Sequence, residues 1–170
     1  MMTEQATNSE PALRRERLEV LIVRAGERWL GTLAEEATGV ERGREPTPLP
    51  HAPDAVLGVV SVRGRILTLL DPLALMGERR AERTDNARPA FILALRGQEQ
   101  LALAVESAEQ LREIFSDEIA QPIGAEARIA RGAFQDAGRR VILLDVTRLF
   151  AAAVEGMEPR RHQRILTDER

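Results

Sequence analysis

Cysteine is absent from this chain of 170 residues, which excludes disulfide bonds, thiol nucleophiles and thiolate metal sites. Aromatic residues are scarce as well: they make up 3% of the chain, with no tyrosine and a single tryptophan, Trp29. Hydrophobic residues nevertheless reach 44%, an ordinary share for a globular protein. We therefore expect a core built from Leu, Val, Ile and Ala, with Trp29 as a packing anchor beside Leu30 and Leu33.

The sequence also lacks an excess of charge of one sign and any long apolar run. Charged residues make up 30% of the chain and the net charge is −3, so there is no basic field to attract a nucleic-acid backbone. No apolar stretch approaches the roughly 20 residues that cross a bilayer, and the N-terminal residues lack the apolar segment of a signal peptide. We expect a cytoplasmic protein that binds no nucleic acid and does not insert directly into a membrane.

The common signatures of catalysis are missing. The sequence has no serine nucleophile elbow, zinc-protease helix motif, phosphate-binding glycine loop or dinucleotide fingerprint. His51 and His162 follow no metal-ligand spacing, and Glu35–Glu36 is interpreted as solvated charge. Asp71 and Asp145 each follow an expected strand and precede a helical turn, which helix N-capping explains without catalysis. We predict no catalytic residue, no metal site and no cofactor.

Short apolar runs separated by turn residues predict paired strands along most of the chain. The expected strands are 18–23, 28–33, 58–62, 65–71, 90–95, 100–105 and 139–146. Residues 34–40 and 108–119 fit a strand or a helix, and 121–134 has the composition of a loop. Asp71 and Pro72 open a short helical turn that Gly77 ends. A helix is expected at 146–154, with one apolar face formed by Val146, Leu149, Phe150, Ala153 and Val154.

Polar and charged stretches mark the expected boundaries of the folded part. Residues 1–17 are expected to form a flexible arm and residues 155–170 a flexible tail. A charged linker is expected near 77–89, and Gly156 should end the last helix. The folded domain is therefore predicted to span residues 18–154.

Two parts of the sequence resemble each other, which predicts an internal duplication. A shift of 72 residues places Arg24 over Arg96, and a shift of 74 places Gly58 over Gly132 and Asp71 over Asp145. Each copy would hold a hairpin, a long connection and a second hairpin that closes on a short helix. We expect two such subdomains, fused in tandem, with a groove between them as a docking place.

The segment Val62-Arg63-Gly64-Arg65 lies at an expected hairpin tip. Gly64 permits a positive φ, and Arg63 offers a guanidinium with five donors and a flat stacking face. The segment is therefore either an ordinary exposed turn or a cation presented to a protein partner.

The stretch PDAVLGVVSVRGRILTLLDP, residues 53–72, resembles the signature of CheW-like chemotaxis coupling proteins. In that signature a proline precedes an apolar G-V-x-N-L-R-G turn, and an apolar strand ending in aspartate follows. The resemblance runs from Leu18 to about residue 153. It implies a mainly β fold of two SH3-like five-stranded β-barrel subdomains with short helices, one of them near the C-terminus. It also implies an adaptor or scaffold without enzymatic activity.

The same resemblance implies partners and contact residues. The partners would be the regulatory domain of a CheA-type histidine kinase and the cytoplasmic tip of a chemoreceptor in an array at the inner face of the membrane. A receptor-facing groove would include Ala37, Thr47 and Arg63. Kinase-facing turns would include Gly58 and Gly64. The residues that line or support these surfaces would be Val40, Val59 and Val62.

Departures from the signature leave alternatives open. Ser61-Val62 replaces its Asn-Leu pair, Thr68 replaces a proline, and Pro72 replaces the leucine after the aspartate. A divergent scaffold of the same fold, serving a pilus or polar-localisation system, is one alternative. An enzyme or small-ligand binder that uses the groove between the subdomains is another, and a cluster of buried titratable side chains there would distinguish it.

Overall fold

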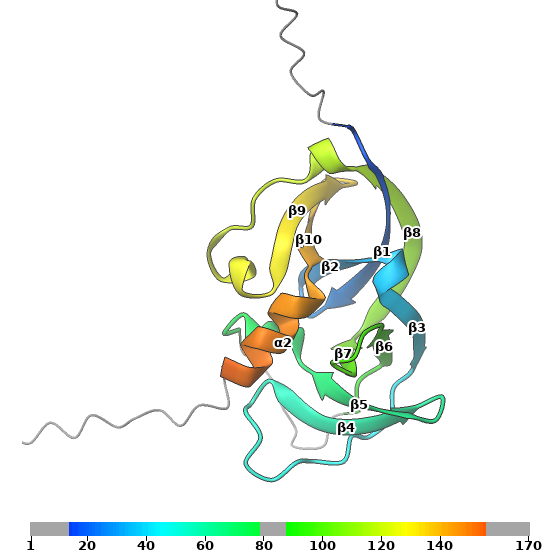
Figure 1. Ribbon diagram of the computed structural model, residues 1–170, viewed down its shortest axis with the longest axis vertical. Helices are drawn as coiled ribbons and strands as arrows, with labels where there is room; N and C mark the ends of the chain where they lie inside the picture. The colour runs from blue at the N-terminus through cyan, green and yellow to red at the C-terminus, as the bar shows by residue number, and fades with distance from the viewer. Residues whose placement is uncertain (1–13, 79–87, 156–170) are drawn as a thin grey trace, which may run out of the picture.

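The computed structural model describes residues 14–78 and 88–155. Within these ranges the chain is mainly β, as the sequence predicts, with short helices (Figure 1). The strands are β1 (Arg17–Ala25), β2 (Arg28–Leu33), β3 (Ala37–Arg42), β4 (Val56–Val62), β5 (Arg65–Leu70), β6 (Phe91–Leu95), β7 (Leu101–Val105), β8 (Ser107–Phe115), β9 (Ala130–Asp136) and β10 (Arg139–Leu144). The helices are η1 (Ala34–Glu36), α1 (Pro72–Leu75), η2 (Ser116–Glu118), η3 (Gly124–Arg128) and α2 (Val146–Glu155).

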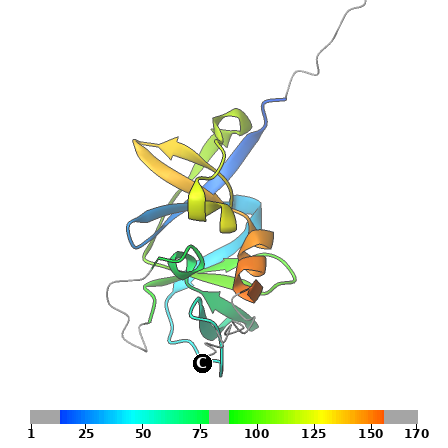
Figure 2. The ribbon, with the colours of Figure 1, turned by 90° about the vertical axis from the view of Figure 1, so that its left-hand side faces the viewer.

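The strands form two five-stranded sheets. The first barrel has the strand order β8-β1-β2-β10-β9, and the second barrel has the order β3-β6-β7-β5-β4. The two lie one above the other, and α2 lies against the side of their junction (Figures 1 and 2). The predicted pair of five-stranded units is therefore present. No helix in the described ranges is long and apolar enough to span a membrane.

The expected tandem arrangement of the two units is wrong. The first barrel combines β1 and β2 with β8, β9 and β10, so it draws strands from both ends of the chain. The second barrel combines the last three strands of the first half, β3, β4 and β5, with β6 and β7. The two halves have therefore exchanged their first hairpins. Sequence similarity between the halves could not reveal this, because either arrangement satisfies the same local patterns.

The duplication itself agrees with the geometry of the two barrels. The hairpin β1-β2 has the same place in the first barrel as β6-β7 in the second, and β9-β10 corresponds in the same way to β4-β5. Each of these last hairpins is bridged by the segment before it, through Thr47 and Val59 in one half and Ala120 and Ala133 in the other. The pairs predicted from the sequence thus occupy equivalent structural positions.

The chain crosses between the barrels at two matching points. At one crossing the Arg96 amide donates to the carbonyl of Glu36, over 2.7 Å. At the other the Glu106 amide donates to the carbonyl of Arg24, also over 2.7 Å. The 72-residue shift superposes Arg24 and Arg96, so equivalent residues bond to both crossings, with Arg96 donating its amide and Arg24 accepting with its carbonyl.

Buried hydrophobic residues in the described ranges form three clusters. The largest, called here the central core, lies between the barrels and includes residues of both sheets and of α1 and α2. The other two fill the interior of one barrel each. Aliphatic residues and alanine dominate all three, as the scarcity of aromatics predicts, and Trp29 packs against the interior cluster of the first barrel. The central core holds the two barrels together through apolar burial.

Both predicted helix caps are present. Asp71 accepts hydrogen bonds from the Leu73 and Ala74 amides, and Pro72 occupies the first helical position. Asp145 Oδ1 accepts from the amides of Thr147 and Arg148 over 3.0 and 3.2 Å. These contacts satisfy amide groups that a helix N-terminus leaves unpaired, so neither carboxylate needs a catalytic explanation.

Three local interpretations change. Both ambiguous segments combine a strand with a short 3-10 helix. Residues 34–40 hold η1 and then the start of β3, and residues 108–119 hold most of β8 and then η2. The segment expected as a loop contains η3 and most of β9. The expected apolar face of α2 is only partly buried, since Leu149 lies in the core whereas Phe150 and Val154 are each 44% exposed. The helix packs instead through Leu149, Ala152 and Ala153, because two alanines let it approach the core closely.

The first strand begins at Arg17, the last residue of the expected arm. The two residues before it are already in contact with the chain: Arg15 lies 3.2 Å from Asp117, and the Glu16 amide donates to the Ser116 hydroxyl. The expected arm before residue 14, most of the charged linker, Gly156, and the tail with His162 lie outside the described residues.

Candidate protein-interaction site

Arg63 and Gly64 form the two-residue tip between β4 and β5, as predicted. Val62 pairs with Arg65, and both tip residues have positive φ, 49° for Arg63 and 77° for Gly64. Two positive φ angles characterise the hairpin turn whose twist matches that of the flanking strands. The glycine adopts this backbone without penalty, whereas an arginine does so at some cost. The Arg63 side chain is 69% exposed.

The guanidinium of Arg63 reaches across the open side of the second barrel to β3. Its Nε lies 2.8 Å from Glu41 Oε1. The other oxygen of Glu41 is 3.1 Å from Arg44, which also donates to the carbonyl of Ser61 over 2.6 Å. One carboxylate thus links the two edge strands of the sheet. Gly39 lies beside this contact, and a Cβ there would lie 3.3 Å from Arg63 Nη2.

Thr47, Gly58 and Val59 form a second group, at the outer edge of β4. Thr47 and Val59 exchange two backbone hydrogen bonds of 2.9 Å. Gly58 lies inside β4 at a bulge and is buried, so its predicted place in a turn is wrong. A Cβ on Gly58 would overlap the Thr47 carbonyl, and its φ is +137°. This glycine therefore has a packing reason for its identity.

Ala37 and Val40 lie on the face of β3 that packs against the central core. Leu21 of β1 packs against the same core and pairs directly with Leu111 of β8, so both leucines face that side. Leu111 is 55% exposed. We call these four residues, Leu21, Ala37, Val40 and Leu111, the apolar seam. It lies between the barrels on the side where β8 and β3 follow one another (Figure 1).

The eight predicted contact residues therefore do not form a single surface. Ala37 and Val40 belong to the apolar seam, while Arg63 and Gly64 occupy the hairpin tip at the barrel's edge. Val62 is 5% exposed and belongs to the interior of the second barrel, where it can only support a surface. Sequence reasoning missed Leu21 and Leu111, because the segment of Leu111 had no clear period and its pairing with β1 is distant in sequence.

The corresponding tip of the first barrel has no arginine. Ala137 and Gly138 occupy it, with φ angles of 48° and 75°. There Arg139 binds Glu109 through two contacts of 3.0 Å and stacks over Trp29 at 3.9 Å. Both barrels are closed by an arginine-carboxylate contact, but only the second carries an arginine in the tip itself. The exposed guanidinium of Arg63 is therefore an addition to the repeated design.

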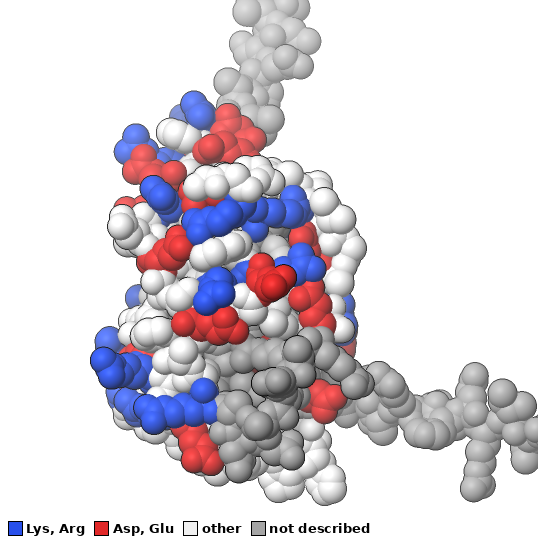
Figure 3. All heavy atoms as spheres, turned by 180° about the vertical axis from the view of Figure 1, so that it is seen from behind, with Lys and Arg blue, Asp and Glu red and all other residues white. Residues whose placement is uncertain are grey.

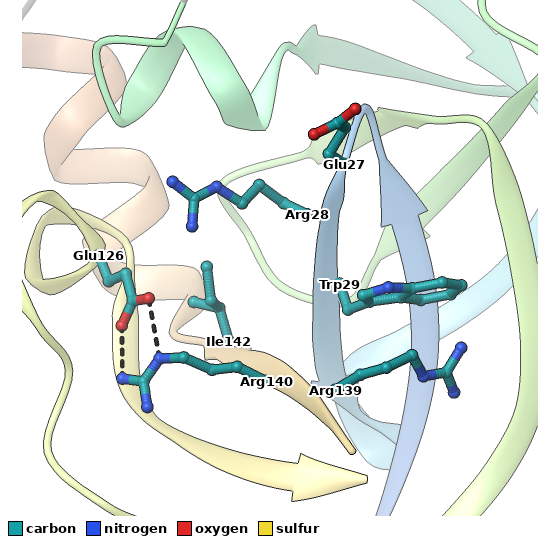
Figure 4. Close-up of a pocket in the computed structure, with 7 residues that line it drawn as sticks. All are labelled: Glu27, Arg28, Trp29, Glu126, Arg139, Arg140 and Ile142. Atoms are coloured by element: carbon teal, nitrogen blue, oxygen red, sulfur yellow. Dashed lines mark hydrogen bonds and ion pairs between the residues drawn. The ribbon is translucent and has the colours of Figure 1, made fainter. Parts of the chain in front are cut away.

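A pocket of about 220 Å³ opens beside β2 and β10 (Figure 4). Its lining residues are Glu27, Arg28, Trp29, Glu126, Arg139, Arg140 and Ile142. Arg140 binds both oxygens of Glu126, at 3.0 and 2.8 Å, and this pairing holds the pKa of the Glu126 carboxyl below its ordinary value. Arg28 and Arg139 are bound to acids as well.

The arrangement of charge around this pocket favours a structural role. Its arginines face carboxylates that they already bind, so no cation in the lining is left for an anionic ligand. The described residues include no group of three or more His, Asp or Glu side chains placed to hold a metal ion. Acidic and basic side chains also alternate over the rear face of the molecule (Figure 3). Five titratable side chains line this pocket, and the ion pairs of its three arginines account for most of that charge without a ligand.

Known proteins resemble this chain in sequence and in fold. "Chemotaxis protein CheW" of Rhizobium meliloti is 34% identical over 115 residues, which cover 64% of this chain and 72% of that protein. "Probable chemotaxis protein CheW" of Rhizobium etli is 32% identical over 116 residues, covering 65% and 73%. "Protein FrzA" of Myxococcus xanthus is 27% identical over 140 residues, covering 79% and 86%.

A solved structure shares the fold. The scaffolding protein TtCheW of Thermoanaerobacter tengcongensis superposes with a TM-score of 0.65 at 16% identity, over 77% of this chain and 90% of that one. The family model for the CheW-like domain matches residues 19–154. The match includes both barrels, the arginine-bearing tip and nearly all of α2. The chain therefore belongs to the CheW-like domain family.

Proposed function

We propose that this chain is a non-enzymatic adaptor that couples chemoreceptors to a CheA-type histidine kinase at receptor arrays on the inner face of the membrane. The observation that carries the proposal is the exposed Arg63 guanidinium, at a glycine-containing tip in a protein of the CheW-like family. The same backbone turn recurs at Ala137-Gly138 in the first barrel, so the turn belongs to the repeated fold and only the guanidinium is particular to the second barrel. An exposed cation that the fold does not repeat is better explained by a partner than by folding.

The apolar seam is the surface that best suits the receptor. Chemoreceptor tips are expected to be helical, and an amphipathic helix binds by laying an apolar stripe along a hydrophobic strip. Leu111 offers exposed apolar area, and Val40 and Ala37 continue the strip on β3. Arg63 borders β3 through Glu41, so it can form a polar contact at the rim of the same interface.

The outer edge of β4 is the surface that best suits the kinase. Thr47 is exposed and lies beside Gly58 and Val59, away from Ala37 with which the family resemblance grouped it. Together with Gly64 at the tip, these residues lie along the β4 edge of the second barrel, opposite the β3 edge that carries Ala37 and Val40. Two separate edges of one small barrel let a single domain hold two partners.

The experiment is a binding assay with a purified receptor fragment and a purified kinase regulatory domain. Arg63→Ala should weaken receptor binding about tenfold, the loss typical of a contact arginine, and leave kinase binding unchanged. Thr47→Arg should do the reverse, because its side chain is exposed and only its backbone pairs with Val59. Arg65→Ala, next to the tip and without an acidic partner in the described residues, is the matched control.

Thermal unfolding of the same variants separates binding from folding. The Arg63 side chain is 69% exposed and Glu41 keeps Arg44 as a partner, so Arg63→Ala should leave the midpoint of unfolding nearly unchanged. Normal binding of both partners by Arg63→Ala would contradict the assignment of the tip.

The second candidate is a scaffold of the same fold for a pilus or polar-localisation system. The departures from the family signature favour it, since Ser61 and Thr68 replace residues next to the tip and in β5. A correctly folded chain that binds no CheA-type kinase, but is retained by components of such a system, would support this candidate over the first.

A further inference from the structure

Helix α2 presents a largely apolar face that the described part of the chain leaves uncovered. Four exposed residues recur there at i, i+3, i+4 and i+7, so they share one side of the helix: Thr147, Phe150, Ala151 and Val154. The opposite side of α2 is buried in the central core. We call the four exposed residues the outer face of α2, and the helix lies at the surface of the molecule in Figure 2.

The other half of the duplication buries the equivalent face. The 74-residue shift places Leu73, in α1, over Thr147. It also places Met76, which follows α1, over Phe150. Leu73 and Met76 are each 5% exposed. The turn at Gly26 lies against Leu73, because a Cβ on Gly26 would be 2.8 Å from the Leu73 Cδ1. The same face is therefore covered in one half and open, among the described residues, in the other.

The charges beside the outer face make it complementary to a copy of itself. Arg148 and Glu155 are seven residues apart, about two helical turns, so they lie on the same flank of α2 with opposite signs. When two copies of α2 pack antiparallel, a two-fold axis midway between these residues places each arginine beside the glutamate of the other copy. Parallel packing would instead place like charges together. The charge pattern thus favours an antiparallel pair of identical helices.

Both charged side chains are available for such a pair. Arg148 Nη1 donates to the carbonyls of Ala127 and Ala130 over 2.9 and 3.0 Å, and Nε lies 3.8 Å from Asp145. These contacts fix the guanidinium, while its Nη2 has no partner among the described residues. Glu155 is exposed and forms no ion pair with a described residue. The fold therefore holds the cation in place and leaves one of its nitrogens for a carboxylate.

The outer face has a small residue where two helices would come closest. The two-fold axis falls half a residue from Ala151, so the two copies of Ala151 would lie about 1.5 Å apart along the helix direction. A methyl side chain at this point lets the helices approach closely. A single helix face is smaller than the roughly 800 Å² per partner of a stable interface, so we expect a weak pair, with a Kd on the order of 100 µM.

We propose that the outer face of α2 is a self-association surface, on which two copies of this chain pair antiparallel. Phe150, Ala151 and Val154 form the apolar contact, and Arg148 of each copy binds Glu155 of the other. The proposal goes beyond the coupling function and requires neither of the partners proposed above. The apolar seam stays accessible in the pair, because α2 lies on the opposite side of the molecule from β3 and β8 (Figure 1).

The absence of cysteine allows a direct test in the whole chain. In A151C, oxidation with diamide should give disulfide-linked dimers about tenfold faster than in T147C. Both positions are exposed on the same face, but two copies of residue 147 would lie about 13.5 Å apart along the helix, too far for a disulfide. Equal rates in the two variants would overturn the antiparallel pair. A monomeric A151C that maleimide cannot reach would overturn it in favour of a contact within one molecule.

Sedimentation of the cysteine-free chain measures the association itself. The average mass should rise towards that of a dimer between about 10 and 500 µM protein. Glu155→Lys should weaken the association about tenfold, because each lysine would face Arg148 of the other copy. Glu45→Lys makes the same change of charge at an exposed residue of the segment before β4 and should have no effect. A monomer mass at every concentration, or equal losses in the two variants, would overturn the proposal.

Discussion

At the scale of single residues, buried polar groups show where the packing is imperfect. The Thr32 side chain is fully buried, and its hydroxyl has no hydrogen-bond partner among the described residues. Thr32 pairs with Leu21, so it faces the central core. Thr32→Val keeps the shape and removes an unsatisfied group. We expect the free energy of unfolding in urea to rise by about 1 kcal/mol.

Thr38 provides the matched control for this substitution. Its hydroxyl donates to the carbonyl of Ala94 over 3.2 Å. Thr38→Val should therefore lower the free energy of unfolding by about 1 kcal/mol, the opposite sign. If both valines destabilise the protein equally, the Thr32 hydroxyl has a partner in solution and the expectation is wrong.

Glu126 makes a pH-dependent contribution with a definite sign. The bidentate bond from Arg140 holds its pKa below the ordinary value of 4.5 in the folded state. A lowered folded-state pKa contributes stability above the unfolded-state value, and that contribution is lost as the pH falls below it. Glu126→Gln should therefore destabilise the protein at pH 7, and the difference from the parent should shrink in acid. A difference independent of pH between 7 and about 3 would exclude this account.

At the scale of elements, local signals predicted the hairpins and long-range packing decided the remainder. The tip at Arg63-Gly64 and the cap at Asp71 were readable because each depends on a few neighbouring residues. The contact of Arg63 with Glu41 was not, because it joins strands distant in sequence. The place of Leu111 in the apolar seam could not be predicted for the same reason, because its partner Leu21 is distant in sequence.

The equivalent glycines of the two halves test the repeated element. A Cβ on Gly58 would overlap the Thr47 carbonyl, and one on Gly132 would overlap Ile119 and approach the Ala120 carbonyl. Gly58→Ala and Gly132→Ala should each lower the free energy of unfolding by about 2 to 4 kcal/mol, because strand backbone must move. Urea unfolding measures the loss.

Gly138→Ala is the control for this pair. Its φ is +75°, but nothing lies within 4 Å of an added Cβ. The cost should be limited to the backbone conformation, about 1 kcal/mol. If Gly58→Ala costs no more than Gly138→Ala, the close approach of the Thr47 segment does not exist in solution.

At the scale of the whole molecule, the exchange of hairpins makes the halves depend on each other. Each barrel takes two strands from one half and three from the other, and the central core joins both. A fragment holding one half would therefore lack part of both sheets. Such interleaving predicts that the two small barrels unfold as a single cooperative unit, because they share the central core.

Cutting the chain between residues 78 and 88 tests this dependence directly. Fragments 1–78 and 88–170 should each fail to show a cooperative unfolding transition, whereas their mixture should recover the strand signal in circular dichroism and a single transition. Leu143→Asp in the second fragment should prevent recovery, since that side chain is fully buried inside the first barrel. A tandem arrangement would give the contrary result, with each fragment folding alone and the substitution affecting only its own half.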